Sequence, residues 1–84
     1  MNGLFEDVKT NTFEIKDMYT AAYLKAKGFK LIRSDKKGAQ VYFYFNDSSA
    51  AHEAVRKLFR DNETVVALDF INAVKNIKSI IHNI

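Results

Sequence analysis

The sequence has no cysteine and no proline, and it has only three glycines. Without cysteine the chain forms no disulfide and no thiolate metal site, so an apolar core must hold this 84-residue chain together. The absence of cysteine also fits a reducing compartment. With 48% hydrophobic residues and seven phenylalanines, the material for one small core is present.

Long hydrophobic runs are missing as well. The uncharged apolar runs fall far short of the roughly 18 residues that a membrane span needs. The first ten residues, MNGLFEDVKT, lack the basic start and the long apolar stretch of a signal peptide. We therefore expect a cytoplasmic protein that does not contact a membrane.

The charges are mixed along the chain. Thirteen lysines and arginines against ten acids give a net charge of +3, and no block of five or more like charges occurs. Strong electrostatic binders usually cluster their cations on one face or in one tract. This balance permits weak binding to nucleic acid without demanding it.

Patterns that carry catalysis or metal binding are also missing. The two histidines, His52 and His82, do not stand in a metal-ligand spacing with a nearby acid, and no glycine-rich phosphate loop occurs. The acids from which a paired-carboxylate site would draw are better explained as strand-end, cap or turn residues: Glu14, Asp17, Asp47 and Glu63. The sequence therefore predicts a protein that is not an enzyme, with no catalytic residue, no metal and no cofactor.

Apolar periodicity predicts a single α+β domain over residues 12–84, after a flexible N-terminal segment at residues 1–11. The expected order is (β)αββαα. A hairpin at about 29–45 forms a small antiparallel sheet that packs with three helices, and the pattern at 12–16 is compatible with a third short strand.

The three helices have recognisable limits. The first runs from about Met18 to Lys27, capped by Asp17 and ended by Gly28, and apolar residues on both of its faces predict that it is sandwiched. The second follows capping residues at 46–48, and the third starts near residue 68 or 69. An apolar stripe marks the second helix at Ala51, Ala54, Val55, Leu58 and Phe59.

The stretch VYFYF at 41–45 directs alternate side chains to opposite faces of a strand. Positions 41, 43 and 45 are expected in the core, and Tyr42 and Tyr44 on the other face. Two interpretations of the tyrosines stay open. A second layer covers their rings, or they form an exposed pair that binds a protein partner or a second copy of the chain.

The second helix carries a basic face. Its cations could join those of the hairpin tip to contact phosphates, and such binding would weaken steeply with salt. The other interpretation is an ordinary solvated helix face. The residues concerned are Lys36, Lys37, Arg56, Lys57 and Arg60.

The stretches FEIKDMYTAAYLKAKGFKLI, VYFYF and ALDFINAVKNIKSII resemble a family of short bacterial and phage proteins described only as a domain of unknown function. The resemblance covers about Thr12 to His82 and departs from the family pattern near 65–68, where a proline is expected. It implies a phage or mobile-element setting in a bacterial cytoplasm and no activity. It depends mainly on Asp17, Tyr19, Ala21, Ala22, Leu24 and Gly28.

These observations together predict a non-enzymatic interaction module that binds an unidentified protein or a second copy of itself. Tyr42 and Tyr44 are the predicted contact residues, with Arg56 and Arg60 as flanking charges. The alternative is a weak nucleic-acid-binding protein that uses the basic helix face.

Overall fold

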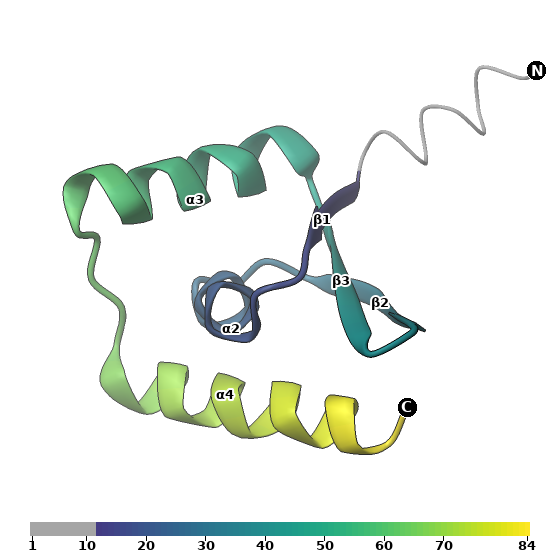
Figure 1. Ribbon diagram of the computed structural model, residues 1–84. Coiled ribbons are helices and arrows are strands. Elements are labelled where there is room, and N and C mark those ends of the chain that lie inside the picture. The colour runs from purple at the N-terminus through teal and green to yellow at the C-terminus, as the bar shows by residue number, and fades with distance from the viewer. Residues whose placement is uncertain (1–11) are drawn as a thin grey trace, which may run out of the picture.

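The structure of the chain is a computed structural model that describes residues 12–84. Its elements follow the order β1, α2, β2, β3, α3, α4, which confirms the predicted α+β fold (Figure 1). The three helices lie on one side of a three-stranded sheet. The predicted flexible segment at 1–11 lies outside the described residues.

The sheet consists of β1 (Thr12–Ile15), β2 (Leu31–Lys37) and β3 (Gln40–Asn46), in the spatial order β1-β3-β2 with antiparallel pairs. Both the hairpin and the short first strand are confirmed. Gly38 opens the two-residue turn of the hairpin with φ of 64°, a value that glycine adopts without a steric cost. Phe13 of β1 and Leu31 of β2 stand opposite Phe45 on the core face.

Helix α2 (Met18–Ala26) fills the centre of the molecule. Ala21, Ala22 and Leu24 are fully buried although they point in different directions around the helix, so the predicted sandwich is confirmed. The helix begins at Asp17, whose side chain accepts a hydrogen bond from the backbone of Thr20. It ends before Gly28, which has φ of 101°.

Helices α3 (Ser48–Asp61) and α4 (Ala67–His82) lie on either side of α2, joined by residues 62–66 (Figure 1). Helix α4 packs closely on α2 through buried Ala73 and Ile77. Helix α3 buries only Ala51 fully. Because α3 has the weaker attachment, part of the surface between the two helices remains open.

Two predicted details are wrong, whereas the start of α4 at Ala67 agrees with the prediction near residue 68. The side chain of Asp47 makes no capping hydrogen bond, because this residue adopts a left-handed conformation with φ of 60°. Phe59 continues the apolar stripe of α3 in sequence, but 73% of its surface is exposed because α3 extends beyond the core there.

Candidate functional site

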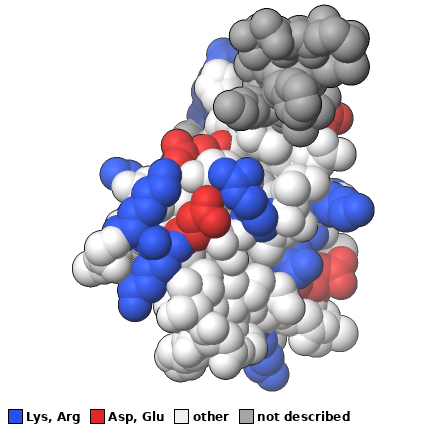
Figure 2. All heavy atoms as spheres, turned by 90° about the vertical axis from the view of Figure 1, so that its right-hand side faces the viewer, with Lys and Arg blue, Asp and Glu red and all other residues white. Residues whose placement is uncertain are grey.

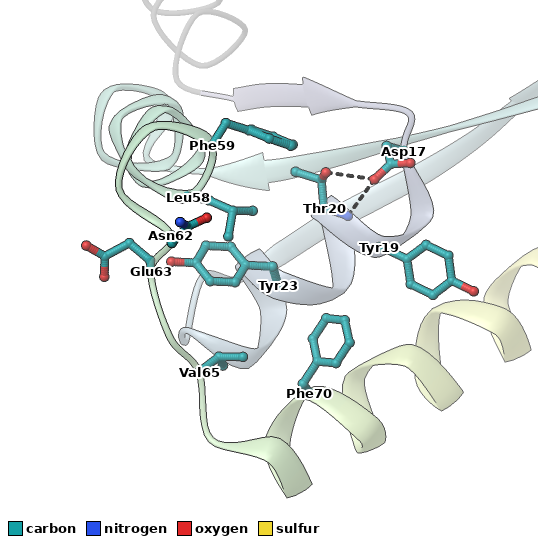
Figure 3. Close-up of a pocket in the computed structure, with 10 residues that line it drawn as sticks. All are labelled: Asp17, Tyr19, Thr20, Tyr23, Leu58, Phe59, Asn62, Glu63, Val65 and Phe70. Carbon is teal, nitrogen blue, oxygen red and sulfur yellow. Dashed lines mark hydrogen bonds between the residues drawn. The ribbon is translucent and has the colours of Figure 1, made fainter.

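The most pronounced apolar hollow in the described part of the chain lies where α2, α3 and α4 approach one another (Figure 3). Its volume is about 410 Å³, within the range of about 300–1,000 Å³ typical of ligand pockets. We call it the helical pocket. Its lining residues are Asp17, Tyr19, Thr20, Tyr23, Leu58, Phe59, Asn62, Glu63, Val65 and Phe70.

Aromatic side chains come from all three helices. Tyr19 and Tyr23 belong to α2, Phe59 to α3 and Phe70 to α4. Phe59 is 73% exposed and Tyr19 is 54% exposed, which is unusual for large side chains beside a half-buried Leu58. Exposed aromatic surface around a concave centre is typical of a site that another molecule covers.

The start of α2 fixes one side of the helical pocket. Asp17 Oδ2 accepts hydrogen bonds from the Thr20 amide at 2.8 Å and from Thr20 Oγ1 at 2.7 Å. These two bonds satisfy an amide that would otherwise be free at the helix start. They also hold Asp17 and Thr20 in one arrangement, as Figure 3 shows. This side of the pocket is therefore built before any ligand arrives.

Tyr23 has a buried ring and a hydroxyl group at the edge of the pocket. Only 4% of the residue is exposed, and its hydroxyl points toward the segment that holds Asn62 and Glu63 (Figure 3). Burial, and then the negative charge of Glu63, raise the pKa of the Tyr23 hydroxyl above its ordinary value. The phenol is therefore neutral at physiological pH.

The predicted pair Tyr42 and Tyr44 lies on the outer face of the sheet, away from the helices. The guanidinium of Arg33 lies 4.0 Å from the ring centroid of Tyr44, and Lys37 Nζ lies 5.2 Å from that of Tyr42. The Tyr44 hydroxyl donates a hydrogen bond of 3.0 Å to Glu14 Oε2.

The cover over these tyrosines therefore includes side chains of the neighbouring strands. No described helix packs on this face, yet only 8% of Tyr44 is exposed, and Tyr42 is half-buried. Figure 2 looks onto this side of the molecule and shows positive charges with negative charges between them. The pair offers less free aromatic surface than the helical pocket.

The predicted basic residues fall into two separate groups. Lys36 and Lys37 stand near the β2–β3 turn, whereas the basic residues of α3 lie at the opposite side of the molecule (Figure 1). On α3, Arg56 forms an ion pair of 2.7 Å with Glu53, and Arg60 one of 3.2 Å with Asp61. The structure therefore does not bring the two groups together into one phosphate-binding face. Lys57 lines a shallow hollow that also includes Glu63 and Lys27.

Residues 12–84 hold no cluster of acids and histidines that is able to ligate a metal ion. His52 packs instead against Phe13, with ring centroids 5.7 Å apart. None of the described helices has the length and hydropathy of a membrane span.

Sequence reasoning missed the helical pocket. Leu58 and Phe59 belong to the predicted apolar stripe of the second helix, and Tyr19 lies in a first helix that was predicted to be sandwiched. The signal that the sequence offered was the presence of apolar residues on both faces of the first helix. Whether a pocket forms between three helices depends on the angles between the helices. The periodicity of apolar residues along one helix does not predict those angles.

Comparisons with known proteins give one family and no individual relative. Neither the curated proteins nor the solved structures contain a match to this chain. A family model described as "Domain of unknown function (DUF5659)" matches residues 10–83, which confirms the resemblance noted in the sequence. Because the match covers nearly all of the 84 residues, the chain belongs to this family of domains of unknown function.

Proposed function

We propose that the protein is a non-enzymatic interaction module that binds another protein through the helical pocket. The observation that carries the proposal is the exposed aromatic surface of Phe59 and Tyr19 on two helices that flank one hollow. Exposed apolar patches on small soluble domains commonly mark surfaces that a binding partner covers. A phage or mobile-element accessory role in a bacterial cytoplasm is part of this proposal.

The helical pocket replaces Tyr42 and Tyr44 as the proposed contact surface. Aromatic hot spots in interfaces lie in pockets that exclude water once the partner binds. The pocket offers such a concave site. The rings of Tyr44 and Tyr42 already contact Arg33 and Lys37, respectively. The Tyr44 hydroxyl already donates a hydrogen bond to Glu14.

Nucleic-acid binding has less support. Two of the three basic residues of α3 are paired with acids, and exposed pairs of this kind leave little net positive potential. Filter binding tests this alternative. It would be favoured if the protein retained DNA or RNA at low salt and if replacing Arg56 and Arg60 by glutamine abolished this retention.

The test of the proposal is site-specific photo-crosslinking. A benzoylphenylalanine at position 59 is compared with one at position 68, since Leu68 is also exposed, at 63%, but does not line the helical pocket. In lysate of the source cells, position 59 is expected to form a discrete protein adduct and position 68 is not. A band of twice the chain mass would identify a second copy as the partner. Equal adducts at both positions, or none at either, would contradict the proposal.

A further inference from the structure

The helical pocket differs in charge from the rest of the chain. Its lining residues include Asp17 and Glu63 and no lysine, arginine or histidine. The whole chain, by contrast, carries a net charge of +3. We call these two carboxylates the acidic rim, because they lie at opposite edges of the pocket in Figure 3. The helical pocket therefore attracts positively charged groups, whereas the net charge of the whole chain attracts negatively charged ones.

The aromatic lining favours the same sign of ligand charge. Four of the ten lining residues are aromatic, and the faces of aromatic rings attract cations through the ring quadrupole. The attraction amounts to about 0.5–1 kcal/mol at exposed sites and increases when water is excluded. The apolar part of the lining, Leu58, Val65 and Phe70, offers contacts to an alkyl chain.

The Tyr23 hydroxyl lies at the edge of the helical pocket, where a bound group is able to reach it. The residue as a whole is 4% exposed, and its hydroxyl forms no hydrogen bond with another residue of 12–84. A neutral phenol accepts hydrogen bonds as well as donating one, so an ammonium or guanidinium group is a suitable partner.

Within residues 12–84, no lysine or arginine forms an ion pair with the acidic rim. Lys27 and Lys57 line the neighbouring hollow beside Glu63, but neither forms an ion pair with it in the described part of the chain. Lys27 Nζ instead donates a hydrogen bond of 3.5 Å to the Thr64 carbonyl. Asp17 uses one carboxylate oxygen for Thr20, so its charge also remains without a counter-ion among these residues.

We propose that the helical pocket takes a lysine or arginine side chain from an apolar segment of the partner protein. The alkyl stem packs on Leu58 and the aromatic rings, and the charged group lies at the edge that holds the Tyr23 hydroxyl and Glu63, with Asp17 at the opposite edge. The inference rests on the proposed function and adds the chemistry of the bound segment.

The test uses three small probes that share a phenylalkyl group: 4-phenylbutylammonium, neutral 4-phenylbutanol and anionic 4-phenylbutyrate. Each is titrated into the isotope-labelled full chain, and NMR shifts of the pocket residues give its affinity. The ammonium is expected to bind about fivefold tighter than the alcohol, from one cation–π contact and one exposed charge pair. The carboxylate is expected to bind most weakly.

The double variant Asp17→Asn and Glu63→Gln should reduce the preference for the ammonium over the alcohol to the part that the aromatic rings contribute, while asparagine preserves the helix cap. The control Asp35→Asn removes a carboxylate of the sheet, paired with Arg33 at 3.1 Å, and should keep the full preference. Equal binding of alcohol and ammonium at the pocket would overturn the charge inference and leave the photo-crosslinking result intact. The inference would also be overturned if Asp35→Asn lost the preference for the ammonium, or if none of the three probes shifted the signals of the pocket residues.

A second copy as the occupant has its own signature. Pocket signals would then shift with protein concentration in the absence of any probe, and this result would overturn the inference. The opposite pattern, ammonium selectivity without an adduct at position 59, would retain the charge preference and reject protein binding. The two proposals therefore fail in different experiments.

Discussion

The guanidinium of Arg33 lies over the ring of Tyr44, 4.0 Å from its centroid, and the hydroxyl of the same tyrosine bonds Glu14 at 3.0 Å. These two contacts join β2, β3 and β1 across the outer face of the sheet. The role that they indicate for Tyr44 is structural.

Replacing Tyr44 by phenylalanine should lower the free energy of unfolding by about 1 kcal/mol, because Glu14 loses its hydrogen bond. Urea unfolding followed by circular dichroism measures this change. Tyr42→Phe is the matched control, since the Tyr42 hydroxyl has no hydrogen bond with another residue of 12–84. A loss as large in the control would contradict the assignment.

Replacing Asp17 by alanine should cost about 1 kcal/mol of stability through loss of the cap on α2, whereas asparagine should be nearly neutral. Thermal unfolding of the two variants checks the difference. Asp47→Ala offers a comparison, because the Asp47 side chain makes no cap bond. If Asp17→Asn proved as damaging as Asp17→Ala, charge rather than capping would be the cause.

Ile77 and Ile71 give a second matched pair on α4. Ile77 is fully buried, so its change to valine should cost about 0.5–1.5 kcal/mol of unfolding free energy. Ile71 is 49% exposed, and the same change there should cost clearly less. Denaturant midpoints compare the two variants, and equal losses would show that α4 packs through a different face.

Stability should fall as pH rises above about 10, the ordinary pKa of a tyrosine. The folded chain raises the pKa of Tyr23, so the unfolded chain releases this proton first and is favoured at high pH. Below that pH both states keep the proton, and the contribution is constant. Unfolding of the wild type and of Tyr23→Phe from pH 8 to 11 isolates it, since the decline should be shallower in the variant.

The effect of Glu63 has a separate readout. Burial is the larger cause of the raised pKa, and Glu63 adds to it. Absorbance titration measures the ionisation of Tyr23 when the curve of the corresponding Tyr23→Phe chain is subtracted. In Glu63→Gln, Tyr23 should therefore ionise at a lower pH than in the wild type. An unchanged titration would place the charge of Glu63 away from the hydroxyl.

Local patterns predicted most of the fold. The cap at Asp17, the end at Gly28 and the alternation in VYFYF depend on neighbours in the chain, and the structure confirms all three. The left-handed Asp47 was missed because a strand must turn there directly into a helix, a geometry set by the packed elements.

The site was predicted less well. The alternation of side chains along a strand correctly predicted that Tyr42 and Tyr44 lie on the outer face. It did not predict the cations beside them, because the register of β2 against β3 decides which side chains meet. The helical pocket joins residues 17 to 70, and only tertiary packing brings them together.

Within residues 12–84, the spatial order β1-β3-β2 leaves two edge strands, and each resists the addition of a strand from another chain. Strand β1 has only four residues and lies beside α3. Strand β2 carries charged residues at 33 and 35–37 and an irregularity between Leu31 and Arg33. Recognition by β-augmentation is therefore disfavoured, and a partner is expected to reach this domain through its helices.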